Sequence, residues 1–138
     1  MPQIISLTVH TGMRQGEVFG LKWDDVDLEK SCLFIRRSLS HVIDKGAVFI
    51  FTSPFGEPIS PTNFSRRYFK PLLKKCDISS DFTFHSLRHN HAKLLLRQGV
   101  NPKIVQERLG HSSIKVTMDT YSHVLPDMQR QAVDALHK

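Results

Sequence analysis

Several features that mark particular classes of protein are scarce or absent in this chain. Its 138 residues include only two cysteines, Cys32 and Cys76, whose separation matches no usual metal-site spacing, so reduced thiols are expected. No apolar run approaches the roughly 20 residues of a membrane span, and the segment Met1–Leu7 does not resemble a signal peptide. These absences argue against a secreted disulfide-rich protein and a membrane protein, and they predict a cytoplasmic location.

Acidic residues are also in deficit, and the remaining composition is that of an ordinary folded domain. Lys and Arg number 19 against 13 Asp and Glu, which gives a net charge of +6. Such a balance favours a polyanionic partner without identifying it. A hydrophobic content of 40% and a charged content of 23% argue against a largely disordered chain. A chain of this length can bury roughly 70% of its unfolded surface, enough for one domain with its own core.

The front half of the chain predicts a helical hairpin followed by a small antiparallel sheet. Segments 3–10 and 14–21 have helical spacing on either side of the turn at Thr11-Gly12. Residues 24–30 form a turn, and two strand-like runs follow, Cys32–Ser38 and Ala47–Phe51. Lys45-Gly46 supplies turn residues between these runs, so we expect them to pair as a hairpin.

The rest of the chain predicts helices separated by clear start and stop signals. Ser60 and Pro61 suit the cap and first turn of a helix, and Pro71 predicts a kink or two short helices before Cys76. Glycine or proline then ends each later helix. The expected helices are His85–Gln98 before Gly99, Lys103–Leu109 between Asn101-Pro102 and Gly110, a stretch from Ser112 or Ser113 towards Tyr121, and an amphipathic helix Asp127–His137.

The densest group of chemically active side chains is Phe84–His91, with three histidines and one arginine. On a helix His85, Arg88 and His89 share one face. His85 and His89 have the spacing of a zincin helix, but Ser86 replaces the glutamate that this motif requires, so a metal site is disfavoured. A phosphate site fits better, because a guanidinium donates two parallel hydrogen bonds and an imidazole can give or take a proton. Histidines with purely structural roles are the alternative.

Three further motifs are ambiguous when each is taken alone. His111 lies in the loop LGHSS between two predicted helices, which can be a simple helix corner. Tyr121, in MDTYSH, can be a half-buried packing residue. Arg14 follows a glycine-containing turn, with Glu17 one helical turn later, which alone fits a surface ion pair.

Taken in order, the motifs TGxRxxE, HxLRH and LGH, with a tyrosine about ten residues after the last, resemble those of the tyrosine recombinase or phage integrase family. Thr11–Asp27 is similar to the first arginine box, Ser60–Cys76 to the linking helix, and His85–Val124 to the second arginine box and the nucleophile. The resemblance implies the DNA breaking-rejoining catalytic-domain fold. It also implies site-specific DNA recombination or integration through a 3′-phosphotyrosyl intermediate, without a metal or any other cofactor.

The resemblance also implies a role for each site residue. Tyr121 would be the nucleophile, and His85 would assist as a base or proton carrier, because a phenol with a pKa near 10 is a poor nucleophile at neutral pH. Arg14 and Arg88 would clamp the non-bridging oxygens of the scissile phosphate, and His111 would hydrogen-bond the same phosphate. The expected partner is double-stranded DNA at an attachment or recombination site of a mobile element. A homo-tetramer is expected on that DNA, with the segment after the tyrosine docking on a neighbour; the alternative is that the final helix Asp127–His137 folds back on its own domain.

Two features of the family have no match in this sequence. No core-binding domain precedes the first arginine box, so residues 1–138 are expected to form the catalytic domain alone. A strand and a helix expected after about residue 49 are also missing, and with them the lysine that protonates the leaving 5′-oxygen. Lys45 is a poor positional match for that lysine. Slow or absent cleavage is therefore expected. The alternatives are a DNA-binding remnant without turnover and a basic helix-turn-helix protein that reads DNA around Gly99–Asn101.

Overall fold

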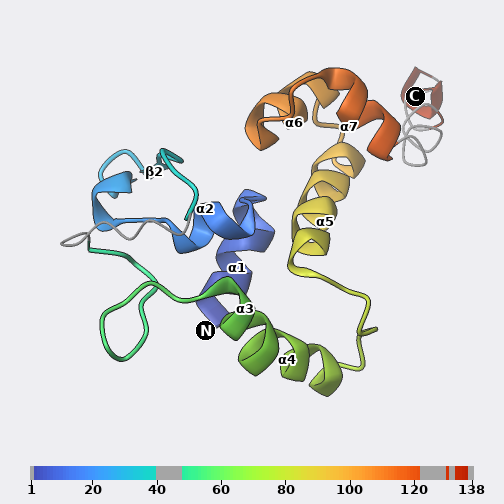
Figure 1. Ribbon diagram of the computed structural model, residues 1–138. Helices are drawn as coiled ribbons and strands as arrows, with labels where there is room; N and C mark the ends of the chain where they lie inside the picture. The colour runs from blue at the N-terminus through green and yellow to red at the C-terminus, as the bar shows by residue number, and fades with distance from the viewer. Residues whose placement is uncertain (1, 40–47, 122–129, 131–132, 137–138) are drawn as a thin grey trace. The chain divides into compact units, whose positions relative to one another are not determined.

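The structure, a computed structural model, describes residues 2–39, 48–121, 130 and 133–136 (Figure 1). The chain divides into two compact units, residues 1–88 and 89–138. The elements in chain order are α1 (Pro2–Thr11), α2 (Gln15–Phe19), the 3-10 turn η1 (Trp23–Asp25), β1 (Val26–Asp27), β2 (Cys32–Leu33), α3 (Pro61–Phe64), the π-helical turn η2 (Ser65–Phe69), α4 (Lys70–Lys75), α5 (Phe84–Arg97), α6 (Pro102–Leu109) and α7 (Ile114–Tyr121). The predicted class, mainly helical with a small antiparallel sheet, is confirmed.

The core of the first unit is built around phenylalanine rings from helices that lie far apart in the sequence. Phe19 of α2 meets Phe64 of α3 edge to face, with ring centroids 5.4 Å apart. Phe84, at the start of α5, lies 6.1 Å from Phe64 and 6.0 Å from Phe69. Ile4 of α1 is fully buried in the same cluster. Since aromatic pairs of this kind add to the stabilisation by area burial, this cluster fixes the start of α5 against α2.

The sheet pairs differently from the hairpin predicted between Cys32–Ser38 and Ala47–Phe51, and that prediction is wrong. β2 pairs with β1, in the register Val26↔Leu33 and Asp27↔Cys32. The turn between them is short and is tightened by Asp27 Oδ1, which accepts from the backbone N of Lys30 at 2.9 Å. Closing such a short loop costs less entropy than closing a long one, so the nearer partner is favoured. Lys45 and Gly46 lie outside the described residues.

The helix after the Pro- and Gly-rich loop is interrupted, as the sequence predicts. Ser60 caps α3, and its hydroxyl accepts from the backbone N of Asn63 at 3.5 Å. The π-helical turn η2 then separates α3 from α4. Pro71 has no N–H to donate and its ring crowds the carbonyl four residues earlier, which falls within this π-helical turn. The break therefore lies just before the proline rather than at it.

The second unit is helical, and both ends of α6 match the predicted caps. Asn101 Oδ1 accepts from the backbone N of Lys103 at 2.8 Å at the start of α6. Gly110 ends α6 in the left-handed conformation, with φ 59° and ψ 40°. The core of this unit consists of Ala92, Leu96, Val105 and Leu109. Most of the predicted helix Asp127–His137 lies outside the described residues, and residues 130 and 133–136 are helical.

At Gly20 the surrounding backbone of the first unit leaves no room for a side chain. A Cβ on Gly20 would lie 2.9 Å from the backbone N of Leu39 and 3.0 Å from the carbonyl oxygen of Gly16, whereas a Cβ on Gly16 would meet mainly the movable hydroxyl of Ser38. We expect Gly20→Ala to lower the free energy of unfolding by about 1–3 kcal/mol through overpacking. Urea unfolding followed by circular dichroism measures it. Gly16→Ala is the matched control, and an equal or larger loss there would contradict the explanation.

Candidate active site

Arg14 lies at the start of α2, where its guanidinium is held at the surface by Glu17. The backbone N of Arg14 donates to Glu17 Oε2 at 2.7 Å, and Arg14 Nη1 donates to Glu17 Oε1 at 2.9 Å. The Arg14 side chain is 49% exposed, while that of Glu17 is 12% exposed. One carboxylate thus caps the helix and orients the arginine, which leaves a preorganised cation accessible to an anion. The ion pair considered from the sequence is present, and it is compatible with a phosphate site.

Arg88 is buried in the second turn of α5, with a relative exposure of 4%. Its Nη1 donates to the carbonyl oxygen of Gly12 at 2.7 Å, across 76 residues of sequence. Gly12 has a positive φ of 70° and lies in the turn immediately before Arg14. This buried hydrogen bond ties the second arginine motif to the turn that precedes Arg14, and both motifs lie within the first unit.

His85 is exposed in the first turn of α5, and the local cap of that helix fixes its position. The backbone N of Thr83 donates to Ser86 Oγ at 3.0 Å, and the backbone N of Ser86 donates to Thr83 Oγ1 at 3.3 Å. Ser86, which replaces the glutamate of a zincin motif, is therefore a capping residue. His85 lines a pocket of about 390 Å³ together with Gln15, the residue after Arg14, and Lys70. This pocket brings His85 to the segment that carries Arg14.

His111 lies in the loop between α6 and α7, and three hydrogen bonds hold it there. Its backbone N donates to the carbonyl of Gln106 at 3.1 Å, and its own carbonyl accepts from Gln106 Nε2 at 2.9 Å. Its ring Nδ1 is 2.9 Å from the hydroxyl of Thr117, a fully buried residue of α7. Because both the backbone and Nδ1 are engaged, the orientation of the imidazole is set by its own unit.

The five predicted site residues fall into two groups. Arg14, His85 and Arg88 belong to the first unit, where Gly12 and the pocket beside His85 connect them. His111 and Tyr121 belong to the second unit, where Tyr121 is the last residue of α7, the helix that follows the His111 loop.

Sequence reasoning missed the residues that hold these side chains. The sequence identifies Gly12 only as part of a turn, yet its carbonyl accepts from Arg88. Gln106 and Thr117 fix the His111 loop, and neither carries a motif of its own. The available signal for Thr117 was its spacing: it lies on the first turns of the helix that follows the loop, where a hydroxyl can reach back to the histidine.

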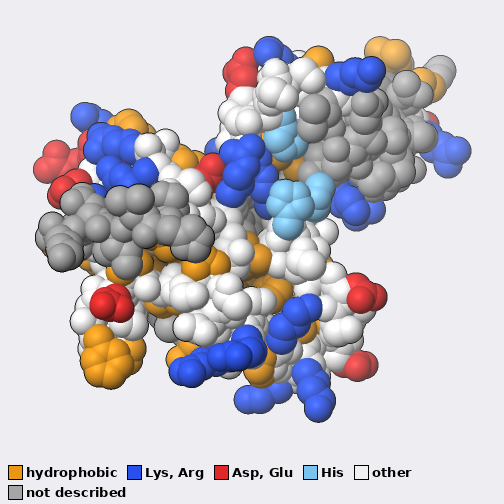
Figure 2. Space-filling view, in the orientation of Figure 1, with side chains coloured by type: hydrophobic (Ala, Val, Ile, Leu, Met, Phe, Trp, Pro, Cys, Tyr) orange, Lys and Arg blue, Asp and Glu red, His pale blue; other side chains and the backbone are white. Residues whose placement is uncertain are grey.

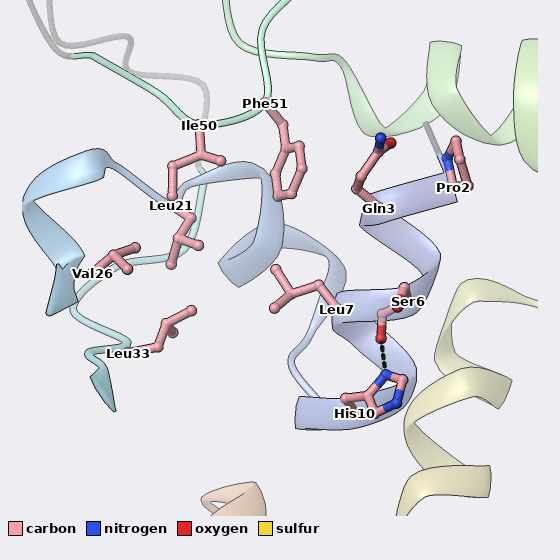
Figure 3. Close-up of a pocket in the computed structure, with 10 residues that line it drawn as sticks. All are labelled: Pro2, Gln3, Ser6, Leu7, His10, Leu21, Val26, Leu33, Ile50 and Phe51. Atoms are coloured by element: carbon pink, nitrogen blue, oxygen red, sulfur yellow. Dashed lines mark hydrogen bonds between the residues drawn. The ribbon is translucent and has the colours of Figure 1, made fainter. Parts of the chain in front are cut away.

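Other chemical possibilities find little support in the part of the chain that the structure describes. Its His, Cys, Asp and Glu side chains form no group of three or more that could hold a metal ion. None of its helices is long and apolar enough to cross a membrane. A pocket of about 750 Å³ in the first unit is lined mainly by apolar side chains, including Leu7, Leu21 and Leu33, and by none of the five predicted site residues (Figure 3).

Comparison with known families decides the classification. The model described as "Phage integrase family" matches residues 2–128, which includes all five predicted site residues. The chain belongs to the phage integrase family. The family resemblance drawn from the four ordered motifs is thereby confirmed.

Relatives of this integrase-family chain include recombinases and mobile-element integrases. It is 28% identical to the tyrosine recombinase XerC-like protein of Caldanaerobacter subterraneus subsp. tengcongensis, with 95% of this chain and 47% of that protein covered. It is 28% identical to the ICEBs1 integrase of Bacillus subtilis, with 91% of this chain and 45% of that protein covered. The chain thus spans about half the length of these relatives. The alignment to the XerC-like protein runs over 189 residues, although the chain has 138.

Solved structures have the same fold. The crystal structure of XerA recombinase is 27% identical, with a TM-score of 0.75 over 94% of this chain and 55% of that chain. The Tn1549 transposon integrase in complex with transposon right end DNA gives a TM-score of 0.77 at 22% identity, over 97% of this chain and 58% of that chain. The expected tyrosine recombinase catalytic-domain fold is confirmed.

Proposed function

We propose that this chain is the catalytic part of a site-specific DNA recombinase of a mobile element, which cleaves and rejoins DNA through a 3′-phosphotyrosyl intermediate. The observation that carries the proposal is the buried hydrogen bond from Arg88 to the carbonyl of Gly12. Because Arg14 follows the turn that contains Gly12, this bond links the positions of Arg14 and Arg88. Two guanidiniums held by one segment can stabilise the negative charge that develops on a phosphodiester under attack. Membership of the phage integrase family supports the same reaction.

In the proposed reaction the phenolic oxygen of Tyr121 attacks the phosphorus of the scissile phosphodiester. The bond from phosphorus to the 5′-oxygen breaks, and His85 takes or relays the proton of the phenol. Arg14 and Arg88 stabilise the charge on the non-bridging oxygens, and His111 donates a hydrogen bond to the same phosphate. The new phosphotyrosyl bond retains the energy of the broken one, so attack by another 5′-hydroxyl reseals DNA without a cofactor.

The proposed partner is double-stranded DNA, and a basic surface on the first unit supports it. Lys and Arg side chains gather along the lower edge of the view in Figure 2, over α3 and α4. The cations of this stretch are all exposed: Arg66, Arg67, Lys70, Lys74 and Lys75. Binding through phosphate contacts releases counterions, so affinity should fall steeply with salt. The similar Tn1549 integrase was solved in complex with DNA. We further propose action in the cytoplasm and assembly as a homo-tetramer on DNA.

We also propose that residues 1–138 are a catalytic domain that lacks an internal strand and helix after about residue 49. The alignment of 189 residues to the XerC-like protein supports this, because it is longer than the chain and the relative therefore has residues within the aligned stretch that this chain lacks. The missing segment would have supplied the lysine that protonates the leaving 5′-oxygen. Without that acid, cleavage of ordinary DNA should be slowed by about 100- to 10,000-fold.

A substrate whose leaving group needs no proton tests this assignment. A sulfur in place of the bridging 5′-oxygen leaves as a thiolate, because a thiol has a pKa of about 8.5. We expect covalent-adduct formation to rise by about 100- to 10,000-fold on the sulfur substrate compared with the oxygen substrate. Single-turnover kinetics on otherwise identical nicked duplexes measure the ratio. Equal rates on the two substrates would show that a general acid is present. Lys45 would then be the first residue to mutate in order to identify that acid.

A DNA-binding remnant without turnover is the second candidate function, and the shortened internal stretch favours it. The deciding experiment incubates the full chain with a nicked, labelled duplex from the recombination site of its element, in EDTA, and resolves the products on a denaturing gel. A slow-migrating protein–DNA adduct supports strand cleavage. Salt-sensitive binding with no adduct on either the oxygen or the sulfur substrate supports the remnant.

A further inference from the structure

The loop that leads into α3 (Figure 1) carries an aromatic ring that the proposed reaction does not use. This ring belongs to Phe55, which is 92% exposed. The backbone N of Ser53 donates to the carbonyl of Glu57 at 2.7 Å, and the backbone N of Gly56 donates to the carbonyl of Ser53 at 3.0 Å. The backbone N of Phe55 donates to Ser53 Oγ at 3.3 Å. These bonds fix the turn, so the ring is held in solvent at a defined place.

Phe55 also lines a pocket of about 340 Å³, together with residues of α3 and η2. The polar residues of this lining include Glu57, Asn63 and Arg67, all of them exposed. The pocket thus offers a flat apolar ring, an amide and a carboxylate for hydrogen bonds, and a cation. A nucleotide has the complementary groups, because a base has two flat faces and a polar edge and is joined to a phosphate. Stacking and pairing cover the base in a duplex, so the ligand that fits is an unpaired nucleotide of single-stranded DNA.

This pocket lies close to His85, on the opposite side of the helical segment formed by α3 and η2. Two different faces of that segment line the two pockets: Pro61, Thr62 and Ser65 beside His85, and Ser60, Asn63, Phe64 and Arg67 beside Phe55. At about 3.6 residues per turn the two sets point in opposite directions. A helix with its side chains is about 10–12 Å across, and neighbouring phosphates of one strand are about 3.4 Å apart along the DNA axis. About three or four nucleotides therefore span the distance between the two pockets.

We propose that the pocket beside Phe55 binds an unpaired base of the DNA strand that cleavage releases, about three or four nucleotides from its free 5′-hydroxyl. The base stacks on Phe55, and Arg67 pairs with its phosphate. The edge of the base bonds to Asn63 and Glu57, because a carboxylate repels a phosphate and accepts from the N–H groups of a base. Holding the released strand beside His85 raises the effective concentration of its 5′-hydroxyl for rejoining. This inference rests on the proposed function and adds a site for the released strand.

The first experiment measures binding of the full chain to a short single-stranded oligonucleotide and to a duplex, both of mixed sequence, by fluorescence anisotropy. We expect Phe55→Ala to weaken single-strand binding about 10-fold, because stacking on an aromatic ring is a main source of such binding. Duplex binding should change by less than about 2-fold, because no charge is lost. Phe55→Trp keeps a stacking ring and should retain single-strand binding. Leu28→Ala is the matched control, since Leu28 is 80% exposed and does not line the pocket. It should change neither affinity.

Two neighbouring arginines test the phosphate contact. Arg66 and Arg67 are both exposed, and their loss changes the net charge equally, but only Arg67 lines the pocket. Arg67→Ala should weaken single-strand binding at least about 3-fold more than Arg66→Ala. Circular dichroism checks that each variant is folded. Equal effects of the two variants would remove Arg67 from the site.

A fluorescent base locates the site along the released strand. The probe is a nicked duplex from the recombination site, with unpaired nucleotides at the 5′-hydroxyl side of the nick and 2-aminopurine at each of these positions in turn. Stacking quenches the emission of 2-aminopurine. We expect the strongest quenching at about the third or fourth position, and its loss in Phe55→Ala. Equal quenching at every position would overturn the placement of the pocket relative to the 5′-hydroxyl.

The binding data separate this inference from the proposed function. Clear duplex binding by the unaltered chain, with equal single-strand affinities for Phe55→Ala and Leu28→Ala, would overturn the base pocket alone. An equal loss of duplex and single-strand binding in Phe55→Ala would also overturn it, because the ring would then not select unpaired bases. If the unaltered chain does not bind duplex DNA at any salt concentration, the proposed function fails, and the inference fails with it.

Discussion

Replacing Tyr121 by phenylalanine is expected to abolish the covalent protein–DNA adduct completely. The substitution removes one oxygen atom, which in the proposed reaction is the atom that bonds to phosphorus, and phenylalanine has no nucleophilic atom in its place. DNA affinity should change by less than about 2-fold, because phosphate contacts by cationic residues dominate binding and Tyr121→Phe removes no charge. The measurement is a suicide-substrate assay on a nicked duplex, with binding followed in parallel by fluorescence anisotropy.

The chain offers a matched control, since it contains only one other tyrosine, Tyr68. Tyr68 is 48% exposed, and its ring stacks on that of Phe64 with centroids 6.1 Å apart. Tyr68→Phe keeps that packing and should leave the amount of adduct unchanged. An adduct that persists in Tyr121→Phe and disappears in Tyr68→Phe would move the nucleophile to the first unit. An adduct that persists in both variants would show that the nucleophile is not a tyrosine.

Much of the helical fold could be predicted because helix ends depend on short-range chemistry. Asn101 followed by a proline, and the left-handed Gly110, define α6 through bonds that span only a few residues. The same holds for Ser60 at α3. Strand pairing depends on which segments come together, and the sequence pattern does not contain that information. The runs at 32–38 and 47–51 both look like strands, yet the short turn before Cys32 brings β1 to β2 first.

The same contrast between short-range and long-range interactions applies to the candidate site. The motifs predict which side chains carry the chemistry, because the residue types and their order can be read directly from the sequence. The partners of those side chains are distant, as in the bond between Arg88 and Gly12 across 76 residues. Sequence spacing placed Arg88 on a helix face shared with His85 and His89, but it could not show that Arg88 is buried while His85 is exposed. The buried Arg88 donates to the carbonyl of Gly12, a partner that only the folded chain brings near.

Arg88 is buried, whereas the side chain of Arg14 is 49% exposed, so replacing each arginine should affect stability to a different extent. Arg88→Ala removes a buried donor and leaves the carbonyl of Gly12 without that bond, which should lower the free energy of unfolding by about 1–3 kcal/mol. Arg14→Ala breaks only a half-exposed ion pair, which should cost about 0.2–1 kcal/mol, since its backbone N still bonds to Glu17. Both variants should slow adduct formation by about 100- to 1,000-fold. Urea unfolding and single-turnover adduct formation measure the two effects.

Arg88→Lys separates the two contributions of Arg88. A lysine keeps the charge but cannot donate in a fork, so it should recover part of the stability and little of the rate. If Arg88→Ala were as stable as the unaltered chain, the bond to Gly12 would not be what joins the two arginine motifs. If both arginine variants formed the adduct at the unaltered rate, the phosphate clamp itself would be wrong, and the cations over α3 and α4 would be the next candidates for that role.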